Sequence, residues 1–192
     1  MTWDDEPERI EAMAWAAAIA ADPRAVYLDT ETTGFGGRAE VVEIAIVDAA
    51  GRPLLDTLVR PVEAIPPDAS AVHGIFDGDV AAAPGWPDLF GEIRRMLEGR
   101  PVVVYNAPFD AGMVLACCGR HGLAAPAGVD GWHCAMRRFA AYRGVRSAGR
   151  GGWRWHRLED AAAHFGVAPG VHRALGDALV CREVVLGMAR GG

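Results

Sequence analysis

Short apolar runs in the first third of the chain predict β-strands. Three such runs, at residues 25–29, 40–48 and 53–60, are bounded by turn residues that include the Gly-rich stretches GFGG and AAGR. Apolar runs of this length between turn signals are typical of strands with buried side chains. Because the three runs are joined by short turns, the pattern favours an antiparallel meander.

Helical segments flank these strands. An Ala-rich stretch at residues 12–21 predicts a leading helix that ends at Asp22 and Pro23. Further along, we expect a helix around residues 86–97, a fourth strand at 101–106, a helix from about 111 to 121, and two or three helices after a Pro/Gly break. Strands that come first and then alternate with helices indicate an α/β fold, with one mixed sheet covered by helices.

The chain shows no internal repeat and no clear linker. We therefore expect a single domain over residues 1–192, with a leading helix within 1–23 and a core over 25–189. The Pro-rich connection at 60–87 is long, and long connections often carry function. The N-terminus is acidic and the Ala-rich stretch is too short to span a bilayer, so we expect neither a signal peptide nor a membrane segment.

Composition and charge narrow the class of protein. Of the 192 residues, 51% are hydrophobic and 23% are charged, and the net charge is −6. This charge excludes a broad basic surface that wraps DNA, so a nucleic acid would have to be held locally, with metal ions offsetting the acids. Four cysteines without C-x-x-C spacing fit neither a zinc site nor a disulfide framework and indicate reduced, buried side chains of a cytoplasmic protein: Cys117, Cys118, Cys134 and Cys181.

Carboxylates gather at the ends of the predicted elements. In the stretch VYLDTETTG, Asp29 and Glu31 project from one face of a strand, because strand side chains alternate with a period of two. They are either solvated acids at a strand end or ligands of a cation that offsets their repulsion. Asp110 falls in the first turn of a helix, His172 on the loop into the last helix, and Asp177 in the early turns of that helix. An all-oxygen set of this kind suits Mg²⁺ or Mn²⁺ and not zinc.

Four motifs occur in an order that resembles a known family. They are LDTETTG, VHGI, NAPFD and HRALGDA, and together with the strand before them they span the chain from Val26 to Ala178. In these motifs the chain resembles the DEDDh 3′-5′ exonucleases and is similar to the proofreading epsilon subunit of bacterial DNA polymerase III. The resemblance implies a ribonuclease H-like fold whose mixed sheet contains the three-strand antiparallel meander.

The resemblance also implies a site for two divalent ions, Mg²⁺ or Mn²⁺. Asp29 is expected to bridge the ions, Glu31 and Asp177 to complete the shell of the first, and Asp110 to hold the second, often through water. Two such ions clamp the attacking and leaving oxygens of a phosphoryl displacement. His172 matches the general base that takes a proton from the attacking water. The expected products are nucleoside 5′-monophosphates from the 3′ end of single-stranded DNA.

Further substrate contacts are expected from residues within the matched motifs. The resemblance places His73 beside the terminal nucleotide, and the candidates as a set are Thr32, Thr33, Gly34, His73, Asn106 and Phe109. Each of them also has an ordinary interpretation as a turn, cap or packing residue. One strand glutamate and the remaining histidines are interpreted as structural: Glu43, His121, His133, His156 and His164.

An arginine-rich segment is the candidate guide for the substrate strand. Residues 137–157 carry seven Arg and no acid. All basic residues of this chain are Arg, so the alternative interpretation is a solvated loop in an Arg-rich protein. Arg beside Trp suits a single strand, because cations neutralise phosphates while indole rings stack on bases. The expected contacts are Arg150, Trp153, Arg154 and Trp155.

Two departures from the family pattern bear on function. Tyr105 stands where the family usually has His, at a position that is not a metal ligand. The chain ends fifteen residues after Asp177 without a polymerase-binding tail, which favours a stand-alone exonuclease, with a DNA polymerase or repair assembly as the candidate partner. RNA trimming is the alternative activity within the family. A nucleic-acid-binding module without catalysis is the alternative outside it, and the intact set of acids argues against that.

Overall fold

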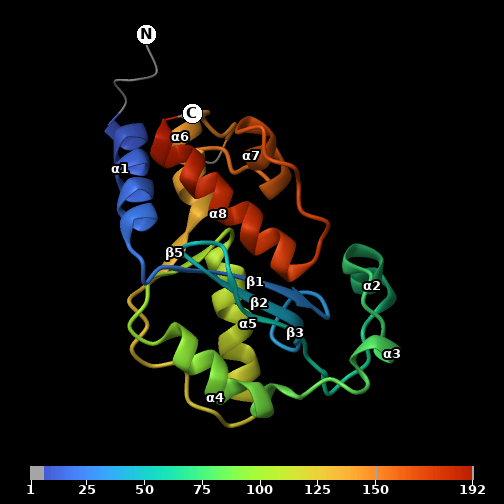
Figure 1. Ribbon diagram of the computed structural model, residues 1–192. Coiled ribbons are helices and arrows are strands. Elements are labelled where there is room, and N and C mark those ends of the chain that lie inside the picture. The colour runs from blue at the N-terminus through green and yellow to red at the C-terminus, as the bar shows by residue number, and fades with distance from the viewer. Residues whose placement is uncertain (1–6, 150, 192) are drawn as a thin grey trace.

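A computed structural model describes residues 7–149 and 151–191 of the chain. Its centre is a five-stranded sheet with the strand order β3-β2-β1-β4-β5 (Figure 1). The strands are β1 (Val26–Thr32), β2 (Val41–Asp48), β3 (Pro53–Leu58), β4 (Val102–Val104) and β5 (Trp132–Cys134). β2 runs antiparallel to β1 and β3, whereas β4 runs parallel to β1 and β5. The mixed sheet and its antiparallel meander were both predicted and are confirmed.

Helices cover both faces of the sheet (Figure 1). On one face, α8 (Ala174–Arg190) packs directly on β1 and β2, with α1 (Pro7–Ala21), α6 (Ala135–Arg143) and α7 (Leu158–His164) around it. On the other face lie α4 (Trp86–Leu97) and α5 (Ala107–Arg120). Two short helices, α2 (Pro67–His73) and α3 (Asp77–Val80), lie beyond the end of the sheet where β1 and β3 finish, and they share a small apolar cluster with Val42.

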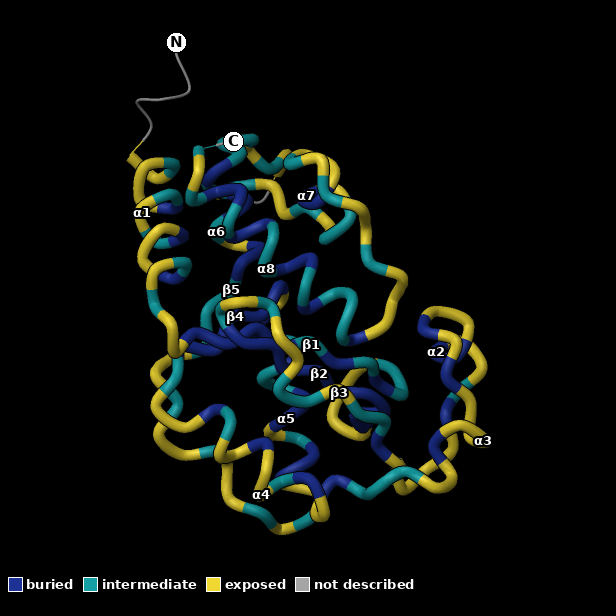
Figure 2. Tube along the Cα trace, in the orientation of Figure 1, coloured by how far each residue is buried: buried dark blue, intermediate teal, exposed yellow. Residues whose placement is uncertain are grey.

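The alternation along β1 assigns its side chains to two cores. Tyr27 packs into the core beneath α8, whereas Val26 and Leu28 pack into the core beneath α4 and α5. Figure 2 shows the central strands buried along most of their length, while β3 at the edge is partly exposed. Since Asp29 and Glu31 follow Tyr27 in steps of two, they emerge on the face that α8 covers.

Several element boundaries differ from the sequence-based expectation. β1 continues to Thr32, beyond the predicted end at Asp29, because Thr30 and Glu31 still pair with β2. α5 begins at Ala107, four residues earlier than expected, since a proline in the first helical turn needs no backbone hydrogen bond. The helix at 86–97 is confirmed, and so are three helices after the Pro/Gly break.

Three short elements were not predicted. β5 has only three residues, and its pairing with β4 comes from tertiary contact, not from an alternating pattern. α2 and α3 have seven and four residues and lie in the Pro-rich connection, where Pro67 opens α2 and Gly74 ends it with a positive φ of 70°. Helices this short give too little periodicity to recognise.

The leading helix is confirmed over Pro7–Ala21, and the part of the prediction over residues 1–6 lies outside the described residues. The four cysteines are free, as expected, although Cys134 is only partly buried. Within 7–149 and 151–191, no helix combines the length and the apolar character that crossing a bilayer requires.

Candidate active site

Three carboxylates from two elements meet near the C-terminal end of β1. Asp29 and Glu31 lie on β1, and Asp177 lies in the first turn of α8. Each offers one carboxylate oxygen, and these oxygens all lie within 4.8 Å of one another. The prediction that Asp29 and Glu31 share a strand face is confirmed, because α8 reaches both from one side of the sheet.

This arrangement fits a divalent cation. Its donor atoms are carboxylate oxygens, which Mg²⁺ and Mn²⁺ prefer as ligands. The three side chains are partly exposed, so an ion can enter from solvent. Without a cation, three carboxylates this close together repel one another.

Burial and the neighbouring negative charges both raise the pKa values of these acids. Burial, followed by the charges of Asp110 and Asp177, raises the pKa of Asp29 well above its ordinary value. Burial and the charge of Asp177 raise the pKa of Glu31 to about 8. Burial also raises the pKa of Asp177, against a smaller opposing effect of His172. Raised carboxyl pKa values are typical of sites completed by a cation.

We predict that the metal-free protein loses stability as the pH rises from about 5 to about 8. Over this range the folded protein binds more protons than the unfolded chain, because the pKa of Glu31 is raised to about 8 and that of Asp110 to about 7. Their stabilising contribution is complete below the ordinary carboxyl pKa and is lost as the pH approaches the raised values. Thermal melts in chelator across this range measure the effect.

Two comparisons make this pH prediction specific. Glu31→Gln should flatten the decline, because the glutamine does not ionise. Added Mg²⁺ should raise the midpoint most at the alkaline end, since an ion that binds only the folded state stabilises that state. A midpoint that stays constant or rises with pH in chelator would contradict the electrostatic description of the site.

Asp110 lies beside this cluster and is held differently. It lies in the first turn of α5, as predicted, and it is buried. Its Oδ1 accepts hydrogen bonds from the backbone N–H of Thr30 at 3.1 Å and from Thr30 Oγ1 at 2.7 Å. Burial raises the pKa of Asp110 to about 7, although the hydrogen bonds from Thr30 lower it. Thr30 lies between Asp29 and Glu31 on β1, so its hydrogen bonds hold Asp110 next to both acids of that strand.

The segment before α8 contains Gly170 and His172, and it passes close to Asp177 in the first turn of that helix. His172 has a φ of 53°, which a non-Gly residue rarely adopts. Its Nε2 lies 3.8 Å from Glu159 Oε1, and its side chain is about half exposed. Gly170 approaches Asp177 so closely that a Cβ on Gly170 would lie 1.5 Å from Asp177 Oδ1. The absence of a side chain at 170 therefore leaves the space that the Asp177 carboxylate occupies.

We predict that Gly170→Ala lowers the nuclease rate by about 10²-fold, the loss expected when a reacting geometry shifts by about 1 Å. The new methyl group must displace the Asp177 carboxylate, whose Cγ would also lie only 2.8 Å from the added carbon atom. The fold should survive, because the displaced atoms are the end of a side chain. Turnover and the metal concentration for half activity measure the effect.

Gly176→Ala is the matched control for this prediction. Gly176 lies on α8 beside Asp177, but a Cβ there meets only the Val171 backbone nitrogen at 4.0 Å. Alanine in a helix also stabilises relative to glycine by roughly 0.5–1 kcal/mol. Equal activity of the two variants would show that close approach at Gly170 does not fix Asp177.

A pocket of about 590 Å³ opens in front of the carboxylates. Aromatic side chains form much of its wall: Phe35 is 91% exposed and lies 5.5 Å from the Phe109 ring between centroids, and Trp155 is 61% exposed. Of the predicted residues, the lining includes Asp29, Glu31, Asn106, Phe109, Asp110, Trp155, His172 and Asp177. Charged ligands and exposed aromatic rings thus share one open cavity.

Other predicted contacts are not part of this lining. His73 is buried, with its Nδ1 accepting from the Ile75 backbone N–H at 3.0 Å and its Nε2 lying 3.2 Å from the Thr32 carbonyl oxygen. Thr32 Oγ1 donates to the carbonyl of Gly34 at 2.8 Å. Thr33 Oγ1 accepts from the Glu40 backbone N–H at 2.9 Å. These contacts shape the turn after β1.

Of the predicted contacts in the arginine-rich segment, some line the pocket and others do not. Trp155 lines the pocket, whereas the Trp153 ring is covered by the Arg146 guanidinium at 3.8 Å from its centroid. Arg154 is exposed outside the lining, and Arg150 lies outside the described residues. The close Arg–Trp contact gives Trp153 a structural partner.

Several site residues carried no recognisable signal in the sequence. Phe35 follows the matched motif in a Gly-rich turn, and Glu159 lies in the first turn of α7. Both line the pocket only because of the fold. Glu43 and His156 were interpreted as structural, yet His156 lines the pocket and Glu43 pairs with Arg173 at the start of α8.

Tyr105, the departure from the family pattern, forms part of the pocket wall. Its hydroxyl is within hydrogen-bonding distance of the carbonyl oxygens of His156, at 3.0 Å, and Arg157, at 2.9 Å. Burial raises the pKa of this hydroxyl, so it remains a donor. Tyr105 therefore ties the end of β4 to the segment that enters α7.

Comparisons with known proteins agree with this geometry. The model of the RNase_T family, described as Exonuclease, matches residues 26–185. Exonuclease CP81 of Escherichia phage 186 is 40% identical over 177 residues, covering 87% of this chain and 89% of that protein. The DNA polymerase III subunit epsilon of Treponema pallidum is 29% identical over 178 residues, covering 88% and 78%.

Solved structures give the same result. Exonuclease X, in complex with 5′ overhanging duplex DNA, matches with a TM-score of 0.60 and 28% identity, covering 86% of this chain and 91% of that chain. The nuclease domain of 3′hExo, a DEDDh family member bound to rAMP, matches with a TM-score of 0.71 and 14% identity, covering 88% and 92%. The second likeness concerns the fold alone.

The sheet and the acidic cluster define a nuclease of ribonuclease H-like fold. The chain belongs to the RNase_T exonuclease family, and the resemblance to DEDDh exonucleases is confirmed. Exonucleases of this type generally use divalent metal ions, which accords with the donor set at β1 and α8.

Proposed function

We propose that this exonuclease hydrolyses single-stranded DNA from the 3′ end, uses Mg²⁺ or Mn²⁺, and releases nucleoside 5′-monophosphates. The observation that supports it most is the convergence of Asp29, Glu31 and Asp177, whose oxygens lie within 4.8 Å of one another, in an open pocket that also contains Asp110 and His172. Four acids and one imidazole form the set that the family resemblance implies.

Each residue of this set has a distinct task in the proposal. Asp29, Glu31 and Asp177 would hold one ion, and Asp29 together with Asp110 would hold the second. Two bound ions supply electrostatic stabilisation of the attacking and leaving oxygens. His172 would accept the proton of the attacking water, and its Nε2 lies 3.8 Å from Glu159 Oε1.

The pocket wall supports a single strand as the substrate. Phe35 and Trp155 expose their rings to the cavity, and aromatic rings bind unpaired bases by stacking, without demanding a sequence. A base within a stable duplex does not offer its face in this way. We propose Trp155 as the contact from the arginine-rich segment, with Arg154 and the other exposed arginines nearby attracting phosphates.

Partners and polymer type belong to the same proposal. The relative from Treponema pallidum is a subunit of DNA polymerase III, so a polymerase or a repair assembly is the candidate partner. RNA is the second candidate substrate, because 3′hExo, which shares the fold, is bound to rAMP.

One set of substrates tests the proposed activity. Linear single strands of DNA and RNA labelled at the 5′ end, a blunt DNA duplex and a circular single strand would be incubated with Mg²⁺ or Mn²⁺ and with chelator. We expect 5′-labelled products that shorten one nucleotide at a time from linear DNA, metal dependence, and an intact circle. Cutting of the circle would contradict an exonuclease, which needs a free end, and faster shortening of RNA would reassign the substrate.

A further inference from the structure

We propose that Glu43 and Arg173 form a positioning pair that holds the start of α8 on the sheet and thereby places Asp177 and His172 at the active site. The roles of Asp177 and His172 rest on the proposed function. The pair itself joins the central strand β2 to the residue before α8, across 130 positions of sequence.

The location of Glu43 calls for an explanation. It is directly opposite Glu31 in the pairing of β1 with β2, and its side chain is buried. A buried carboxylate is unfavourable unless it is paired and hydrogen-bonded. Here the neighbouring acids make the burial of another negative charge still less favourable, because like charges repel.

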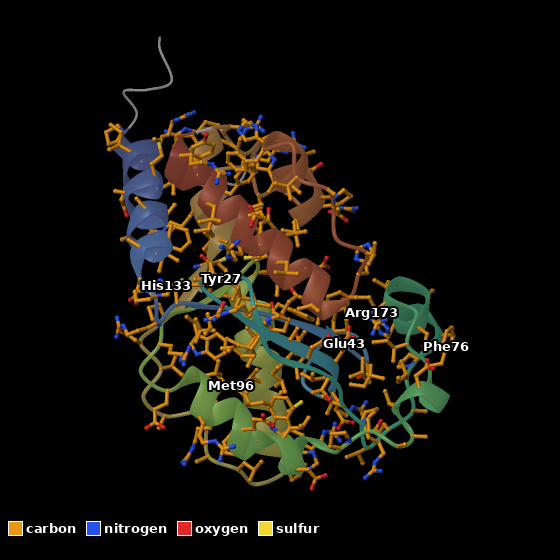
Figure 3. The ribbon with its side chains drawn as sticks, in the orientation of Figure 1. Tyr27, Glu43, Phe76, Met96, His133 and Arg173 are labelled. Atoms are coloured by element: carbon orange, nitrogen blue, oxygen red, sulfur yellow. The ribbon has the colours of Figure 1, made fainter. Side chains whose placement is uncertain are left out.

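Arg173 offsets this charge with a forked contact. Its Nε lies 3.0 Å from both carboxylate oxygens of Glu43, and its Nη2 donates to Oε1 at 2.5 Å. Figure 3 labels the two residues side by side, Glu43 on β2 and Arg173 at the beginning of α8. The planar guanidinium fixes direction as well as distance, which a flexible ammonium group does not.

Glu43 also caps the helix. Its Oε2 accepts a hydrogen bond from the backbone N–H of Ala174 at 2.9 Å. Arg173 occupies the N-cap position and makes no capping hydrogen bond with its own side chain. The first N–H groups of a helix need acceptors, and a carboxylate there also interacts favourably with the helix dipole. The cap for α8 is therefore supplied by the sheet.

The contact between Glu43 and Arg173 is connected directly to the three close carboxylates of the active site. The backbone N–H of Asp177 donates to the carbonyl of Arg173 at 3.0 Å. Fixing Arg173 against Glu43 thus fixes the turn from which Asp177 projects. On the other side of Arg173 stands His172 with its φ of 53°. An unfavourable backbone conformation of this kind persists only where its surroundings hold it in place.

Glu43 acts through these contacts and not as a ligand. Its oxygens are occupied by Arg173 and Ala174, and it belongs neither to the pocket lining nor to the group of three close carboxylates. Supporting residues around a metal site typically change metal affinity or activity by about 10- to 100-fold when they are replaced. We expect Glu43 to be of this kind.

Glu43→Gln is the principal test. We expect the Mn²⁺ dissociation constant, measured by calorimetry, to rise about tenfold, and kcat on a short single strand to fall about tenfold with KM unchanged. The Arg173 side chain is 49% exposed, so it can turn to solvent when the carboxylate is lost. Arg173→Gln removes the same pair from the other side and should give the same shifts. The double variant should be no worse than either single variant, because both remove one interaction.

Glu40→Gln is the matched control. Glu40 is likewise buried, immediately before β2, where it accepts backbone N–H groups of Val62 and Glu63 and lies 3.7 Å from Arg120. Its replacement should lower the thermal midpoint without changing the Mn²⁺ dissociation constant.

The outcomes are distinguishable. The proposal is overturned if Glu43→Gln and Arg173→Gln bind Mn²⁺ as the wild type does, or if they change the Mn²⁺ dissociation constant no more than Glu40→Gln does. The pair is then merely structural. If the wild type binds Mn²⁺ but cuts no nucleic acid, the proposed function fails, while calorimetry on the three single variants still decides the positioning role.

Discussion

Asp29→Asn should lower the nuclease rate by at least about 10³-fold, because the proposed function makes Asp29 a ligand of both ions, and such ligands support stabilisation of several kcal/mol in the transition state. The same substitution should raise the thermal midpoint of the protein in chelator at neutral pH. Burial and the surrounding acids raise the pKa of Asp29, so ionising it in the folded state is unfavourable, and asparagine removes that cost. Loss of activity and gain of stability from one change is characteristic of a ligand within a repelling cluster.

Nuclease assays and paired thermal melts, with chelator and with Mg²⁺, measure this result. Mg²⁺ should raise the midpoint of the wild type and scarcely move that of Asp29→Asn. Asp130→Asn is a suitable control, because Asp130 is an exposed carboxylate that pairs with Arg24. An Asp29→Asn protein that kept its activity, or that melted lower in chelator, would argue against Asp29 as a metal ligand.

His172→Ala should lower kcat by about 10²- to 10⁴-fold, the range expected for loss of a general base. Metal binding should be retained, since imidazole is not part of the carboxylate group. Single-turnover rates, together with Mn²⁺ calorimetry, measure these effects.

The backbone of His172 requires a second variant. Its φ of 53° is poorly tolerated by alanine but is more accessible to asparagine. His172→Asn therefore removes the imidazole while preserving the local conformation. If the ring supplies the chemistry, the two variants should lose activity equally. Much higher activity in His172→Asn than in His172→Ala would assign the effect to the shape of the chain.

The sequence predicted those parts of the fold and site that depend on local pattern. The apolar runs of the meander, the helix at 86–97 and the period-two placement of Asp29 and Glu31 were all correct, because alternation and helical periodicity are properties of neighbouring residues. The family resemblance was carried by four short motifs, each fixed in sequence. The very short elements β5, α2 and α3 were missed, since three to seven residues contain too little pattern to recognise.

Some predicted contacts depended on geometry that local pattern does not contain. Trp153 and Trp155 are two residues apart in one arginine-rich segment, yet Trp155 lines the pocket while Arg146 covers Trp153. His73 lies within a matched motif, but its ring nitrogens contact backbone groups of Thr32 and Ile75. Which side of a loop faces a cavity is set by packing with distant residues.

The sequence by itself determined the strands of the meander and the acids, because residue type and spacing express these directly, and its four motifs indicated the class of chemistry through the family resemblance. Only the tertiary structure decided what holds the acids in place. Glu43 and Arg173 form a pair although 130 positions separate them in the sequence. Gly170, which has no side chain, leaves space for the Asp177 carboxylate. Phe35 packs against Phe109 in the pocket wall. These contacts join segments far apart in the chain. Their geometry exists only after β2 has joined the sheet and α5 and α8 have packed on it.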